Sequence, residues 1–154
     1  MIKYLFSNVD KVNGFNEQQI KYLSIDLKTC KSILFVPGDY DKEKYIIYKD
    51  KIIGWFENID IIFKEKHLAS LDGELKCYDA IFLMGGNPIN QIEIINKINL
   101  KNIINKAKVV IGVSAGAINL SKEAIYFNDY NNKVEMYDGL GLTDINVYPH
   151  LKYN

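Results

Sequence analysis

One serine lies where a nucleophile could be formed. The apolar run 109–113 leads directly into Gly112-Val113-Ser114-Ala115-Gly116, a Gly-x-Ser-x-Gly pattern, and a helical stretch follows. Small residues on both sides let a strand turn sharply into a helix, so that the serine Oγ projects above the sheet and the next amides face an oxyanion. We therefore predict Ser114 as a nucleophile and the Ala115 amide as an oxyanion donor. The alternative is that Ser114 caps the next helix.

A second strand end offers bare backbone next to this serine. The run 79–84 is followed by Gly85-Gly86-Asn87 and then by Pro88, which suits the first position of a helix. Ligands of open α/β sheets bind at the carboxyl ends of strands. We therefore predict that Gly85, Gly86 and Asn87 bind the substrate or its oxyanion. An ordinary tight turn is the alternative.

The elements that must position these residues follow an alternating pattern. Short apolar runs predict strands at residues 2–6, 32–36, 59–63, 80–84 and 109–113, and helical spacing predicts helices over 41–57 and 91–107. Further on, a short strand is predicted at 124–127, a turn at 128–133 and a strand at 146–149. The pattern indicates an α/β protein with a mostly parallel sheet and helices on both faces.

Three segments together resemble a known family. Residues 79–87, 111–117 and Tyr148-Pro149-His150 are similar to the aspartyl dipeptidase (peptidase E) family, which has a Gly-Gly-Asn loop, a Gly-x-Ser-Ala-Gly-Ala turn and a Pro-His pair. The resemblance implies a flavodoxin-like, doubly wound fold related to class I glutamine amidotransferases. It also implies hydrolysis of small peptides that begin with aspartate. His150 would then take the proton of Ser114, while amides near Gly86 and Ala115 hold the oxyanion.

The acid partner of the histidine is less clearly marked. Asp129 falls where the family carries an acidic residue after the serine, although a solvated turn suits it equally well. The family's third triad carboxylate comes after the Pro-His pair, and this sequence ends four residues past His150. It also contains no arginine to recognise an aspartyl side chain. We therefore expect one domain over residues 1–154 that lacks its C-terminal part and has impaired activity.

Two other functions fit the same residues. A general α/β-hydrolase would place its acid before the histidine, so Asp129, Asp138 or Asp144 could complete a site with Ser114 and His150. A non-catalytic remnant could keep the pocket to bind a ligand or to oligomerise. Labelling by an active-site serine probe would distinguish these possibilities.

Composition excludes several classes of partner. Nineteen lysines balance nineteen acidic residues, so there is no basic field for nucleic acid. Two cysteines and two histidines without ligand spacing predict no metal, and we expect no organic cofactor. With no secretory signal, the sequence predicts a reduced, cytoplasmic protein without a membrane partner. The expected partner is a small peptide substrate, and a homodimer is left open. His67 lies in a charged run and is predicted to be a surface residue.

Overall fold

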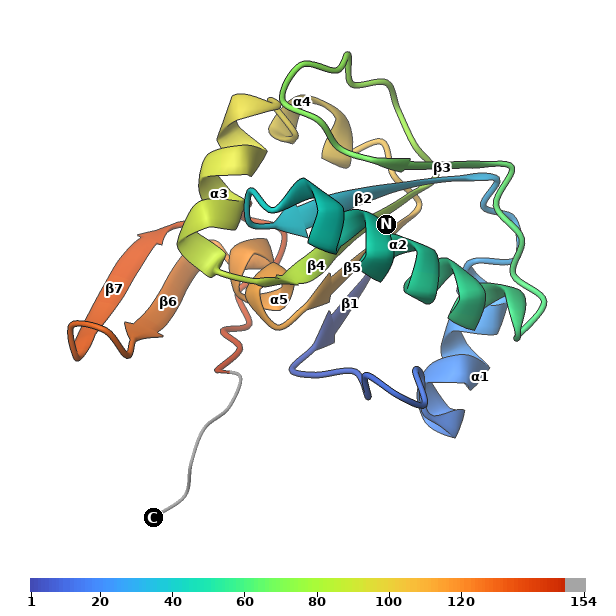
Figure 1. The fold of residues 1–154 in the computed structure, drawn as a ribbon, viewed down its shortest axis with the longest axis horizontal. Coiled ribbons are helices and arrows are strands. Elements are labelled where there is room, and N and C mark those ends of the chain that lie inside the picture. The colour runs from blue at the N-terminus through green and yellow to red at the C-terminus, as the bar shows by residue number, and fades with distance from the viewer. Residues whose placement is uncertain (149–154) are drawn as a thin grey trace.

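A parallel sheet flanked by helices forms the body of the computed structural model, which describes residues 1–148 (Figure 1). The sheet has the order β1-β5-β4-β2-β3, and every pairing within it is parallel. The strands are β1 (Ile2–Phe6), β2 (Ser32–Gly38), β3 (Glu65–Leu68), β4 (Ala80–Gly86) and β5 (Val109–Val113). The helices are α1 (Glu17–Asp26), α2 (Lys42–Glu57), α3 (Pro88–Lys97), α4 (Lys101–Ile104) and α5 (Ala115–Leu120).

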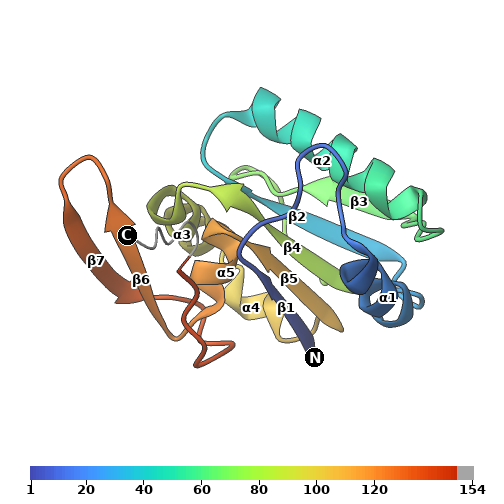
Figure 2. The same ribbon diagram turned by 90° about the horizontal axis from the view of Figure 1, so that it is seen from below.

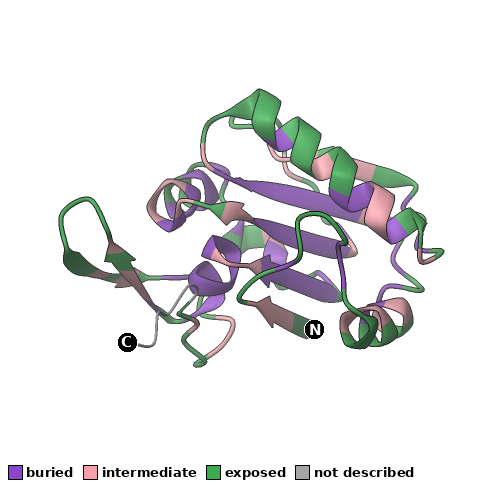
Figure 3. Ribbon diagram, turned by 60° about the horizontal axis from the view of Figure 1, so that its bottom comes forward, coloured by how far each residue is buried: buried purple, intermediate pink, exposed green. Residues whose placement is uncertain are grey.

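Two apolar cores cover the two faces of the sheet. One joins α1 and α2 to alternate strand residues such as Phe35 and Phe82, and the other joins α3 and α4 to their neighbours, such as Leu34 and Leu83. The central strands are buried over nearly their whole length, as Figure 3 shows. Strands buried on both sides explain the continuous apolar runs in the sequence. The predicted flavodoxin-like α/β fold is therefore confirmed.

One predicted strand is wrong. Residues 61–63 form no strand, because the end of α2 is followed by a left-handed residue, Asp60, with φ 61°. Ile61 and Phe63 are buried where this connection closes the core. The third strand is instead β3, at the edge of the sheet, where Lys64 first donates to the Lys31 carbonyl. Edge strands carry charged side chains, so β3 lacks the apolar signal of a buried strand.

The predicted helix over 91–107 is two helices. It begins earlier, with Pro88 at the first helical position as expected, and α3 ends at Lys97. Asn99 has φ 55°, its N–H donates to the Asn96 carbonyl, and the next N–H donates to the Ile95 carbonyl. This is the Schellman pattern, in which asparagine tolerates the left-handed position. The other predicted helix matches α2, whereas α1, with its Asn16–Gln19 capping box, was not predicted.

The last described segment is an antiparallel hairpin of β6 (Glu123–Asn128) and β7 (Lys133–Asp138). The short strand and the turn predicted here are present, but the return strand was not foreseen. Figures 1 and 2 show the hairpin projecting from the side of the sheet. The strand predicted over 146–149 is absent from residues 146–148, and Pro149 lies outside the described residues.

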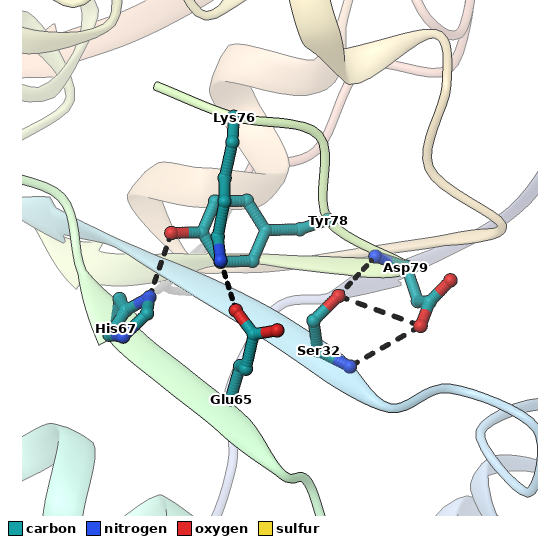
Figure 4. A network of polar contacts seen from close by, with 6 residues as sticks. All are labelled: Ser32, Glu65, His67, Lys76, Tyr78 and Asp79. Carbon is teal, nitrogen blue, oxygen red and sulfur yellow. Dashed lines mark hydrogen bonds and ion pairs between the residues drawn. The ribbon is translucent and has the colours of Figure 1, made fainter. Parts of the chain in front are cut away.

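Asp79 joins the starts of three strands, and Figure 4 shows its contact with Ser32 at the start of β2. Its carboxylate accepts the backbone N–H of Lys31 at 2.8 Å and lies 3.2 Å from the Lys108 ammonium group. The Lys31 N–H, followed by Lys108, holds the pKa of this carboxyl below its usual range. The same view shows His67, exposed as predicted, with Nδ1 2.9 Å from the Tyr78 hydroxyl.

Candidate functional site

Ser114 occupies a strained turn between β5 and α5. Its backbone has φ 52° and ψ −109°, a conformation that residues with a side chain rarely adopt. Its N–H donates to the Phe6 carbonyl at 2.8 Å, and its side chain makes no capping hydrogen bond to α5. The capping alternative therefore lacks the hydrogen bond that would define it. Ser114 is half-buried at this turn.

The glycines on either side of Ser114 are required by close packing. A Cβ atom at Gly112 would lie 2.7 Å from the carbonyl group of Gly116, and one at Gly116 would lie 2.2 Å from the Leu83 carbonyl oxygen. Both distances are too short for a side chain. The Gly-x-Ser-x-Gly pattern therefore lets α5 fold back against the ends of β5 and β4, which produces the sharp turn at Ser114.

The structure brings the predicted glycine loop next to Ser114. A Cβ atom at Gly85 would lie 3.7 Å from the Cβ atom of Ser114. The reason is topological: β4 and β5 are neighbours in the sheet, and their pairing runs to Leu83 opposite Gly112. The direction of the crossovers reverses between β2 and β4, which is where ligands of open α/β sheets bind.

Gly86 lies against a tyrosine that the sequence did not single out. It has φ 150°, and a Cβ atom there would lie 2.2 Å from the Tyr45 hydroxyl oxygen. Tyr45 is fully buried and donates from its hydroxyl to the Gly85 carbonyl oxygen at 2.9 Å. Burial, followed by the charge of Asp39, raises the pKa of Tyr45 well above its usual value. Its hydroxyl therefore stays a hydrogen-bond donor.

Asn87, for which substrate binding is predicted, is the N-cap residue of α3. Its side-chain oxygen accepts the N–H groups of Ile89 at 2.9 Å and of Asn90 at 3.0 Å, so it caps α3. Its backbone N–H donates to the Gly38 carbonyl at 3.0 Å. The oxygen of this side chain is thus engaged in starting α3.

A chain of three polar side chains lies behind the loop. The Tyr137 hydroxyl donates to Asn119 at 2.7 Å, Asn119 donates to Gln91 at 3.0 Å, and Gln91 donates to the Met84 carbonyl at 2.7 Å. Gln91 and Asn119 are fully buried. Burial raises the pKa of Tyr137, so it remains a donor. Sequence reasoning missed this network, although polar residues in apolar stretches were its visible signal.

The structure describes the three candidate acids but not the candidate base. Asp129 lies in the exposed turn of the hairpin, which Figures 1 and 2 show projecting away from the sheet, so the structure does not bring it beside Ser114. Asp138 ends β7 and Asp144 follows in a bend, and both are exposed. His150 lies outside the described residues. The roles assigned to these four residues therefore stay predictions.

Other features lie away from this site. One surface hollow of about 400 Å³ adjoins Cys30, another of about 480 Å³ adjoins His67 and Tyr78, and Ser114 lines neither. Within residues 1–148 no cluster of three potential metal-ligating side chains occurs. In the same part of the chain, no helix combines the length and the apolar character needed to cross a bilayer.

Comparison with known proteins agrees with this geometry. The family model of peptidase family S51 matches residues 5–154, which is almost the whole chain. The chain therefore belongs to peptidase family S51, and the resemblance to the aspartyl dipeptidase family is confirmed. A search of curated proteins found no match.

Proposed function

We propose that the protein is a serine-type peptidase that hydrolyses small peptides beginning with aspartate. The observation that carries this proposal is the strained backbone of Ser114, held next to Gly85 in a chain of peptidase family S51. A serine that serves only packing does not need a backbone conformation that costs of the order of 1–3 kcal/mol. Strain of this kind is typical of reactive positions.

Each step of the proposed reaction has a candidate residue. The Oγ of Ser114 attacks the peptide carbonyl carbon while His150 takes the hydroxyl proton. The amide groups of Gly86 and Ala115 stabilise the oxygen anion that forms. His150 then gives its proton to the leaving amine. Water next attacks the ester between Ser114 and the acyl group while His150 takes a proton from it, and His150 returns this proton to the Ser114 oxygen as the acyl group is released. The role of His150 depends on the Pro-His resemblance. Its acid partner is left unassigned, because Asp129 lies in the exposed turn of the hairpin.

Substrate recognition must work without arginine. The chain has no arginine, so the aspartyl carboxylate of the substrate would be bound by lysine or by backbone amides. Lysine offers a point charge instead of a planar fork, which gives weaker discrimination between carboxylate and amide side chains. We therefore expect Asp-Leu to be cleaved faster than Asn-Leu, with a modest preference.

A fluorophosphonate probe tests the proposal directly. The probe should label the purified protein with loss of fluoride, and peptide mass spectrometry should place the label on Ser114. Ser114→Ala should abolish labelling. Ser70→Ala, which changes an exposed loop serine, should leave it unchanged. If the protein remains unlabelled, or if the label persists in Ser114→Ala, then Ser114 is not an activated nucleophile and the non-catalytic alternative is favoured.

A further inference from the structure

The proposed oxyanion loop consists of Gly85 and Gly86 at the end of β4. Tyr45 belongs to a different element, α2, and its side chain reaches this loop. Its hydroxyl oxygen lies 2.9 Å from the Gly85 carbonyl oxygen and 3.5 Å from Asp39 Oδ2. A Cβ atom at Gly86 would clash with the same hydroxyl, so only glycine allows this approach. The side chain is fully buried, and it therefore cannot contact a substrate in this structure.

The contact fixes a whole peptide unit. The carbonyl of Gly85 and the N–H of Gly86 belong to one planar group, and the described residues contain no cis peptide bond. In a trans peptide the C=O and the N–H point in opposite directions. A hydroxyl group that holds the Gly85 carbonyl therefore turns the Gly86 N–H away from Tyr45.

The sheet pairing shows the direction in which this N–H points. Gly86 is paired with Gly38 of β2, and the hydrogen bond to the Gly38 carbonyl comes from the N–H of Asn87. Successive N–H groups of a strand point to opposite neighbours. The Gly86 N–H therefore faces the β5 side, where the pairing has already ended at Gly112 and where Ser114 follows.

Two helical layers hold consecutive carbonyl groups at this strand end. Gln91 of α3 donates to the Met84 carbonyl at 2.7 Å from one face of the sheet. Tyr45 of α2 donates to the Gly85 carbonyl from the other face. Glycine backbone is flexible when unsupported. The paired contacts thus leave the Gly85–Gly86 peptide with one orientation.

We propose that Tyr45 is a positioning residue that aims the amide N–H of Gly86 at the oxyanion forming beside Ser114. The inference rests on the proposed function. It adds that the Gly86 N–H is already oriented before the substrate binds. Donors held in place before the reaction contribute most to stabilising the transition state. Removing the hydroxyl group should therefore slow bond formation at Ser114 without weakening the initial binding of a reagent.

Saturation kinetics with a fluorophosphonate separate these two effects. In Tyr45→Phe, the maximal labelling rate should fall about tenfold, a fraction of the 10²–10³ effect of deleting a donor outright. The half-saturating concentration should stay within about twofold, because Tyr45 contacts no reagent. Tyr48→Phe is the matched control, since this partly exposed tyrosine lies one turn further along α2 and its ring packs against Tyr45. It should change neither value.

A structural measurement keeps the inference independent of activity. The amide signal of Gly86 in protein labelled with ¹⁵N-glycine should shift in Tyr45→Phe and stay in place in Tyr48→Phe. A Tyr45→Phe protein that labels within about twofold of the unmodified chain, or one with an unshifted Gly86 signal, would overturn the inference. Absence of labelling in the unmodified chain contradicts the proposed function instead, and the Gly86 signal then still decides whether Tyr45 orients this amide.

Discussion

The side-chain nitrogen of Asn119 lies 3.0 Å from the side-chain oxygen of Gln91, and both residues are fully buried. This contact joins α5, which follows Ser114, to α3, which follows the glycine loop. Asn119 also accepts from Tyr137 and donates to the Pro88 carbonyl at 3.0 Å. A single side chain thus ties both strand ends of the candidate site to the hairpin.

Asn119→Leu should destabilise the protein by about 2–4 kcal/mol. The substitution leaves the buried Gln91 oxygen and the Tyr137 hydroxyl without a partner, and each unsatisfied group costs about 1–3 kcal/mol. Urea denaturation measures the change in the free energy of unfolding. Asn102→Leu, at an exposed position of α4, is the control and should stay within about 0.5 kcal/mol. Equal changes in the free energy of unfolding for the two variants would show that the buried network does not stabilise the protein.

Gly116→Ala should both destabilise the fold and abolish labelling of Ser114. The new methyl group would lie 2.2 Å from the Leu83 carbonyl oxygen, so α5 must move away from the strand ends. Overpacking of this kind costs about 1–3 kcal/mol. Thermal unfolding and probe labelling measure the two effects.

Gly54→Ala is the matched control for that substitution. Gly54 lies inside α2, where an added Cβ atom meets nothing within 4 Å. Alanine in a helix interior is more stable than glycine by about 0.5–1 kcal/mol, so this variant should gain stability and keep its reactivity. A stable and reactive Gly116→Ala protein would contradict the close approach of α5 to β4.

Ser114→Gly should raise stability while it removes reactivity. A glycine adopts φ 52° without the strain that serine carries, and the relief is about 1 kcal/mol. The melting temperature should therefore rise above that of the unmodified chain as labelling disappears. Ser121→Gly provides the contrast, because this buried serine has no positive φ and donates to the Ile145 carbonyl at 2.7 Å. It should lose stability.

Asp79→Asn should lower stability at pH 7 by about 1.5–3 kcal/mol, the range for a hydrogen bond to a charged group. The pKa of Asp79 is lowered in the folded state, so its carboxylate stabilises the protein above the unfolded pKa of about 3.9. That stabilisation is lost as the pH falls through the folded pKa. The difference between the unmodified chain and Asp79→Asn should therefore shrink from pH 7 to pH 3 in urea titrations. Asp72→Asn, in an exposed loop, should show no such difference at either pH.

The sequence by itself determined the fold class and the setting of Ser114. Buried parallel strands require continuous apolar runs, and the sharp turn requires glycines at 112 and 116, so both features are visible without coordinates. Local sequence patterns did not predict the edge strand or the break in the second predicted helix. The edge strand β3 carries charges in place of an apolar run, and Asn99 divides a periodic stretch by adopting a left-handed conformation.

Tertiary structure alone decided which residues surround the serine. Gly85 lies beside Ser114 because β4 and β5 are neighbours. Tyr45 reaches Gly85 across 40 positions of sequence because α2 packs over β2, the strand that pairs with β4. The pairing of Asn119 with Gln91 likewise spans 28 positions. A hydrogen bond between distant side chains leaves no periodic trace, since each partner needs only one suitable atom at one place. The sequence could therefore indicate Ser114 as a candidate nucleophile, but it could not indicate the groups that hold its surroundings in position.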